Sequence, residues 1–139
     1  MRLIVHRAAD SDLDELYDSE DPTLEDMAAA IEVLLEEISN DPAFLCRMYR
    51  PNQLWLGEPS GDTDRIVSLW QCGYNILRLK VRDKGKTIPY RILYAFDGQN
   101  DVLHVLGILH RNTCYDKTHP QYHRVVSDYM SLGMPVYRQ

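Results

Sequence analysis

The sequence predicts an α+β fold for a single domain that spans residues 1–139, with helices near the N-terminus, an antiparallel sheet after them and a helix at the C-terminal end. Three observations predict this fold. Apolar residues recur at helical spacing in residues 23–40, apolar and polar residues alternate in several segments after residue 65, and the last segment is again amphipathic. A chain of 139 residues, 45% of them hydrophobic, can bury its own core.

The first third of the chain combines a short strand with an acidic, helical region. Residues 2–7 are rich in β-branched side chains and predict a strand. The polar residues 8–22 form a connection for which partly helical and mobile structure both stay open. Residues 23–40 predict the most regular helix of the chain, with Thr23 as the cap of its first turn.

Proline and turn-forming residues divide the middle of the chain. Pro42 fits the first turn of a second short helix, and Pro51 ends that helix because proline disfavours helical angles in the residue before it. Residues 57–64, GEPSGDTD, predict a loop. Strand-like segments follow, joined by short polar connectors that favour hairpins, so we expect an antiparallel meander of three or four strands. The segments are residues 66–70, 75–82, 90–97 and 102–110.

The C-terminal segment predicts one more amphipathic helix. Pro120 fits its first turn, apolar side chains follow at helical spacing, and Gly133 marks its end. We expect this helix to pack against the sheet.

Cysteine spacing and hydropathy exclude several classes of protein. The three cysteines Cys46, Cys72 and Cys114 are widely spaced, so we expect no disulfide framework or zinc ribbon, and three reduced, buried thiols. No metal-ligand pattern is present, and we expect no metal ion or cofactor. Because no apolar run approaches the roughly 20 residues of a membrane-spanning helix and the start of the chain is charged, a cytoplasmic protein without a membrane partner is expected.

Charge is distributed unevenly along the chain. The net charge of −6 by itself argues against a nucleic-acid partner. However, residues 1–45 hold 13 acidic and 2 basic side chains, whereas residues 46–139 hold 8 acidic and 13 basic ones. Any anion-binding surface must therefore lie in the second part of the chain.

One predicted strand has a basic face. In residues 75–82 the period of two places Arg78, Lys80 and Arg82 on one face and the leucines and valine between them on the other. Such a strand is either a solvent-exposed edge that its charges protect from aggregation or a wall of an anion-binding site. Six basic residues stand between Arg78 and Arg91 against the single acid Asp83, which favours the anion-binding interpretation.

A stretch of the predicted sheet resembles a known family. Residues 90–111 have the sequence YRILYAFDGQNDVLHVLGILHR. This segment resembles the central strand–turn–strand signature of the RelE/ParE toxin superfamily, and the resemblance extends over residues 74–111. The resemblance implies a helical hairpin at the N-terminus that packs on a twisted antiparallel sheet. It also implies the toxin component of a type II toxin–antitoxin system, with a cognate antitoxin as partner.

The resemblance leaves two activities open. One branch of the superfamily consists of ribosome-associated endoribonucleases that cut messenger RNA without a metal, and the other poisons DNA gyrase without acting as a nuclease. A third interpretation is an inactive toxin fold that only binds a partner protein. Ribosome and mRNA, or alternatively DNA gyrase, are the corresponding targets.

In the nuclease branch, the resemblance places basic residues around the scissile phosphate. Attack of a 2′-OH on its own phosphate needs a proton acceptor, charge stabilisation and a proton donor for the leaving oxygen. The predicted catalytic residues are Lys80, Arg91, Arg111 and Tyr115, and the proton donor is sought among Tyr115, His119 and His110. The predicted RNA- or anion-binding residues are Arg78, Arg82, Lys84, Lys86 and His110.

Overall fold

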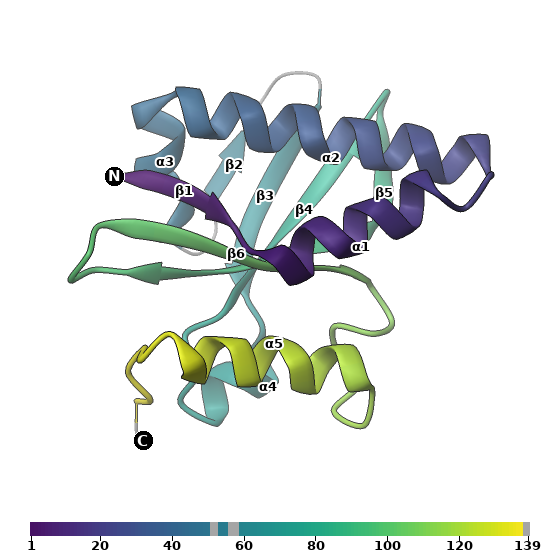
Figure 1. The fold of residues 1–139 in the computed structure, drawn as a ribbon. Helices are drawn as coiled ribbons and strands as arrows, with labels where there is room; N and C mark the ends of the chain where they lie inside the picture. The colour runs from purple at the N-terminus through teal and green to yellow at the C-terminus, as the bar shows by residue number, and fades with distance from the viewer. Residues whose placement is uncertain (51–52, 56–58, 138–139) are drawn as a thin grey trace.

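A mixed six-stranded sheet forms the centre of the computed structural model of this chain (Figure 1). The structure describes residues 1–50, 53–55 and 59–137. The strands are β1 (Arg2–Val5), β2 (Gln53–Trp55), β3 (Ser60–Arg65), β4 (Leu77–Asp83), β5 (Lys86–Asp97) and β6 (Val102–His110). Their order across the sheet is β1-β6-β5-β4-β3-β2, with β1 parallel to β6 and every other pair of neighbours antiparallel.

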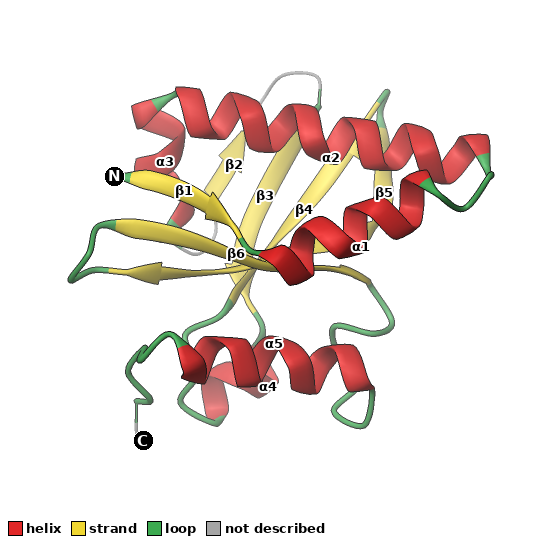
Figure 2. Ribbon diagram, in the orientation of Figure 1, coloured by secondary structure: helices red, strands yellow, loops and turns green. Residues whose placement is uncertain are grey.

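Helices cover both faces of this sheet (Figure 2). They are α1 (Arg7–Tyr17), α2 (Pro22–Asn40), α3 (Pro42–Met48), α4 (Val67–Gln71) and α5 (Pro120–Ser131). The antiparallel pair α1 and α2 lies on one face together with α3, whereas α4 and α5 lie on the other. The α+β class, the N-terminal helical hairpin and the C-terminal helix are thus confirmed. Within the described ranges, no helix combines the length and the apolar character needed to cross a membrane.

The sheet separates two hydrophobic cores because successive strand residues point to opposite faces. Leu79 of β4 and Ile92 of β5 are fully buried under α1, α2 and α3. Leu93 of β5 and Leu109 of β6 are fully buried in the second core, where Val125 of α5 covers them. Each strand therefore contributes apolar side chains to both layers, and α5 is needed to cover the second one.

Residues 8–22, for which the sequence left helical and mobile structure open, are mostly helix α1. Ala9, Leu13 and Leu16 recur at helical spacing, and all three are buried against the first core. The following helix α2 begins one residue earlier than predicted. Its cap is Asp21, whose Oδ1 accepts from the Thr23 N–H at 2.9 Å, so Thr23 is the capped residue rather than the cap.

Two predictions in the middle of the chain are wrong. The predicted loop 57–64 contains most of strand β3, and the predicted strand 66–70 is helix α4 with Ile66 as its cap residue. In β3, Gly61 and Thr63 are buried opposite Val81 and Leu79 of the first core. Pairing with β4 makes this segment a strand, although its polar sequence has a low strand propensity. Gly57 and Glu58, and Pro51 as the end of the short helix, lie outside the described residues.

The prediction of three buried thiols is also wrong in part. Cys114 is fully buried, but Cys46 and Cys72 are exposed. Cys46 lies on the outer side of α3, and Cys72 follows the last turn of α4, so neither side chain reaches a core.

One carboxylate ties the two helical layers to the edge of the sheet. Strand β1 pairs with β6 only as far as Val105, and no other strand of the described residues continues along that β6 edge. An extra residue at Leu106 shifts the register with β5 and turns the Ile108 N–H toward this edge. The Asp12 carboxylate of α1 accepts a hydrogen bond from that N–H at 2.9 Å. It also accepts hydrogen bonds from both terminal nitrogens of Arg124 of α5, at 2.9 and 2.7 Å.

Close approach of α5 to the sheet makes this contact possible. A Cβ added to Gly107 would lie 2.9 Å from Nη2 of Arg124 and 2.6 Å from Cδ1 of Leu109. A larger residue at this position would have to displace the side chains of Leu109 and Arg124. Asp12 itself is only 5% exposed, so its charge depends on Arg124 for compensation.

We expect Asp12→Ala to destabilise the protein by about 3 kcal/mol, because it leaves Arg124 and the Ile108 N–H without their acceptor. Urea unfolding followed by circular dichroism measures the change. Asp14→Ala removes an exposed carboxylate from the same helix and should shift stability by about 0.5 kcal/mol or less. Equal losses in the two variants would contradict this role of Asp12.

Candidate functional site

Four of the predicted basic residues share one face of the sheet. Arg78, Lys80 and Arg82 of β4 alternate with residues of the first core and therefore point away from α2. Arg91 of β5 is the cross-strand partner of Lys80 and lies on the same side. We call these four residues the basic face. Arg78 and Arg91 are buried, whereas Lys80 and Arg82 are partly exposed.

Carboxylates from β3 neutralise much of the basic face. Arg78 donates to Oδ1 of Asp62 at 2.8 Å, and Arg82 donates to Oδ2 of the same carboxylate at 3.1 Å. Asp64 lies 3.9 Å from Arg78 on the other side. Two guanidinium groups thus share one aspartate, and the side chain of Arg78 retains only 11% of its exposure.

Sequence reasoning missed Asp62 and Asp64 because they fell within the predicted loop 57–64. A strand signal was present in GDTD, residues 61–64, where small or buried residues alternate with aspartates. Turn-forming residues at both ends of this run gave the stronger local indication. The pairing of Asp62 with Lys80 and of Asp64 with Arg78 across the strands places both acids beside the basic residues.

Arg91 is engaged by the backbone rather than open to a ligand. Lys80 pairs with Arg91 but Arg82 pairs with Thr87, so β5 is irregular around Pro89, which has no N–H to donate. The Arg91 guanidinium turns back and donates to the Ile88 carbonyl at 2.8 Å and to the Tyr90 carbonyl at 3.5 Å. At 6% exposure, Arg91 serves to satisfy this irregular backbone.

The remaining predicted site residues are dispersed. His110 pairs with Tyr90 and contacts its ring edge-on at 5.3 Å, on the face that α2 covers and therefore opposite Arg91. Lys84 and Lys86 lie at the tip of the β4–β5 hairpin, beside the start of α2. Arg111 and Tyr115 are exposed in the turn after β6. Lys84, Lys86 and His110 lie apart from the basic face, whereas the turn that carries Arg111 and Tyr115 adjoins it, because the Arg111 N–H donates to the Pro89 carbonyl of β5 at 2.7 Å.

A buried thiol lies near the basic face. The pKa of Cys114 is raised, mainly by burial, although Arg91 and the side chain of Tyr115 act in the opposite direction. Its Sγ donates to the Arg111 carbonyl at 3.4 Å. The thiol is therefore held protonated and has the character of a packing residue rather than a nucleophile.

A second titratable cluster lies at the junction of β1 and α1. Nε2 of His6 is 2.8 Å from Nδ1 of His104, and Nε2 of His104 is 3.7 Å from the Asp97 carboxylate. Burial and the neighbouring His104 lower the pKa of His6, against an opposing effect of Asp128. Within the described part of the chain, no three His, Cys, Asp or Glu side chains gather in a way that could hold a metal ion.

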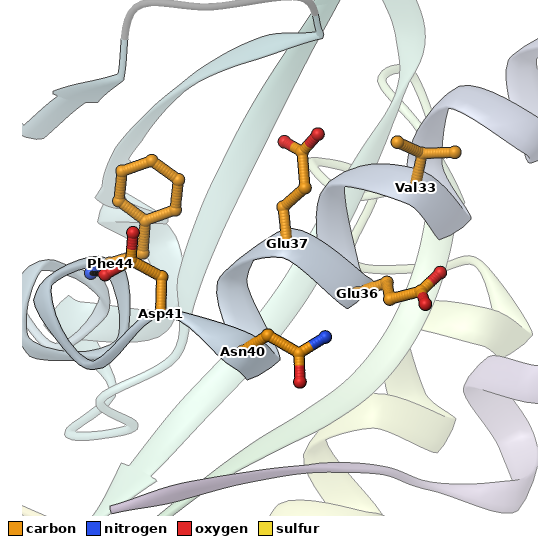
Figure 3. Close-up of a pocket in the computed structure, with 6 residues that line it drawn as sticks. All are labelled: Val33, Glu36, Glu37, Asn40, Asp41 and Phe44. Atoms are coloured by element: carbon orange, nitrogen blue, oxygen red, sulfur yellow. Dashed lines mark hydrogen bonds between the residues drawn. The ribbon is translucent and has the colours of Figure 1, made fainter.

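The outer surface of the helical layer is acidic. A hollow of about 520 Å³ between α2 and α3 is lined by three carboxylates, and Figure 3 shows Glu37 and Phe44 extending to the same side of the two helices. Its lining residues are Val33, Glu36, Glu37, Asn40, Asp41 and Phe44. None of them is a cation, so this hollow is unsuited to phosphate.

Comparison with known proteins identifies a family. The model of the ParE toxin of type II toxin–antitoxin systems, parDE, matches residues 3–115. No curated protein and no solved structure matches the chain. The matched range covers strands β2 to β6 and all of β1 except Arg2, together with Asp62 and the basic face, and it ends before α5.

We expect Arg91→Ala to lower the free energy of unfolding by about 2 kcal/mol, because the buried Ile88 carbonyl loses its donor. Thermal or urea unfolding measures this loss. Arg111→Ala is the matched control, since it removes an exposed arginine whose backbone N–H, but not its side chain, bonds to Pro89. Unchanged stability in Arg91→Ala would contradict the structural role.

The His6–His104 contact predicts a pH-dependent stability. The folded protein holds the pKa of His6 below its usual value of 6.5, so the unfolded chain binds the proton more readily. The contribution of His6 is complete above the unfolded pKa and is lost as the pH falls. Urea midpoints at about pH 7.5 and about pH 5.5 should differ more for the wild type than for His6→Gln. An identical pH dependence in the two proteins would contradict this expectation.

Proposed function

Because the chain belongs to the ParE toxin family of type II toxin–antitoxin systems, we propose that it arrests growth by binding DNA gyrase and that it does not cleave messenger RNA. Membership of the family implies a cognate antitoxin as its partner. Gyrase binding is one of the two activities that the sequence left open.

The sharing of Asp62 by Arg78 and Arg82 is the observation that carries this proposal. Metal-free RNA cleavage needs cations that are free to meet the charge that develops on the phosphorane. An arginine already paired with a carboxylate contributes little net positive charge to such a site. With Arg91 held by backbone carbonyls, three of the four cations of the basic face are engaged within the protein.

The predicted proton-transfer groups His110 and Tyr115 are not among the four residues of the basic face. Lys80 is the cation of the basic face for which no ion pair occurs among the described residues. His110 lies on the opposite face of the sheet. Tyr115 is half exposed in the turn after β6. A general acid and a general base must both lie within hydrogen-bond reach of the reacting oxygens, and this arrangement supports a binding surface better than a catalytic centre.

An endoribonuclease remains the second candidate because Lys80 and Arg91 are direct cross-strand neighbours. If the Asp62 contact opened on the ribosome, three arginines and a lysine would lie on one side of the sheet. The two candidates differ in their target, so one pair of assays separates them.

The target is tested in a supercoiling assay with relaxed plasmid, DNA gyrase and the purified protein. We expect a few-fold molar excess of the protein to reduce supercoiling by roughly tenfold, which corresponds to a binding free energy of about 1.4 kcal/mol at the working concentration. After induced expression in a bacterial host, we expect growth arrest and a DNA-damage response without new 5′ ends in ribosome-bound mRNA.

Two results would contradict the proposal. New mRNA 5′ ends that disappear in Lys80→Ala would establish the nuclease instead. Normal growth during expression without an antitoxin, together with uninhibited gyrase, would indicate an inactive toxin fold that only binds a partner protein.

A further inference from the structure

We propose that Asp62 determines the specificity of the basic face: its carboxylate occupies the position between Arg78 and Arg82 where a phosphate group would bind, and so closes a latent phosphate site. The inference rests on the proposed function in one respect, since it explains how a toxin with this many aligned cations avoids RNA. It concerns a residue outside the predicted site, and the ligand class is a phosphate of a single-stranded nucleic acid.

Register places Asp62 at the centre of the basic face. It lies directly across the sheet from Lys80, and Arg78 and Arg82 flank Lys80 two residues away on either side. Along a strand this separation spans roughly 13 Å, yet both guanidinium groups converge on the one carboxylate. Arg78 takes Oδ1 and Arg82 takes Oδ2, so each oxygen serves a different arginine.

This geometry is the one that a phosphate would use. Guanidinium groups bind carboxylate and phosphate oxygens by the same short, charge-assisted hydrogen bonds. An aspartate attached to the neighbouring strand competes with a dissolved anion at a high effective concentration. A phosphate that displaced it would also leave the Asp62 carboxylate, whose side chain is 22% exposed, close to the incoming negative charge.

Local charge shows what the removal of Asp62 would change. Arg78, Lys80 and Arg82 carry three positive charges, and Asp62 and Asp64 compensate two of them. Replacing Asp62 by asparagine keeps the side chain's shape but raises the net local charge by one, and it removes one of the two oxygens that accept from Arg78 and Arg82. Asp64 lies 3.9 Å from Arg78 alone and its side chain is 40% exposed. The same change at Asp64 therefore alters the contacts of the arginines much less.

The test compares variants with equal changes in net charge. Asp62→Asn is the test variant, Asp64→Asn is the matched control on the same strand, and Asp14→Asn on α1 accounts for net charge alone. Each protein is titrated into a fluorescently labelled 12-nucleotide oligouridylate, and anisotropy is measured at several salt concentrations. Circular dichroism and urea unfolding establish that each variant is folded.

We expect Asp62→Asn to bind the oligouridylate about tenfold more tightly than the wild type, with log Kd changing more steeply with log salt, by about 0.7 for each additional phosphate that the variant neutralises. Asp64→Asn and Asp14→Asn should change the affinity by about threefold or less, as expected for a single exposed charge. Asp62→Ser, a second neutral replacement that a strand tolerates, should repeat the tighter binding and serves in place of Asp62→Asn if that variant does not fold.

Two outcomes would overturn the inference: a folded Asp62 variant that binds no more tightly than Asp64→Asn, or a wild type that already binds as tightly as the Asp62 variants. Neither outcome depends on gyrase. Conversely, failure of the wild type to inhibit supercoiling would overturn the proposed target. The inference about Asp62 would still be tested by the ratio of the oligouridylate affinities of the Asp62 variants and the wild type.

Discussion

The contact of Asp12 with the Ile108 N–H and with Arg124 is the constraint on which the arrangement of the layers depends. In a sheet with helices on both faces, the two helical layers must be held in a fixed position relative to each other. Here one buried carboxylate joins α1, the edge of β6 and α5. Once α5 is held at Gly107, its apolar side covers the second core around Leu93 and Leu109. The remaining part of that face is left to charged residues, which determines where the basic face lies.

A carboxylate that accepts from two separate residues plays a central role twice in this molecule, with different consequences. Asp12 is almost fully enclosed, so its pair with Arg124 acts on stability and breaking it leaves an uncompensated buried charge. Asp62 is partly exposed and compensates two arginines whose cations would otherwise be available to an anion. In the first case the ion pair joins structural layers, and in the second it removes a binding property from the surface.

Irregular pairing in the sheet decides which side chains are left for function. The extra residue at Leu106 turns the Ile108 N–H toward Asp12, and the irregularity at Pro89 leaves carbonyls that Arg91 satisfies. Both polar side chains are thereby used in the fold. An arginine in a basic cluster is therefore not by itself evidence of a ligand site, because the same donors that suit a phosphate also suit an unpaired backbone carbonyl.

The sequence by itself determined the α+β class, the regular helices α2 and α5, the strands β4 to β6, and the common face of Arg78, Lys80 and Arg82, because all of these follow from local periodicity along the backbone. Only the tertiary structure decided that the polar run GDTD is strand β3, that residues 66–70 are helix α4, and that Asp62 and the carbonyl of Ile88 engage Arg78, Arg82 and Arg91. The reason is physical: periodicity settles which face a side chain lies on, whereas its partner depends on strands that pair across long separations in the chain, which no local pattern encodes.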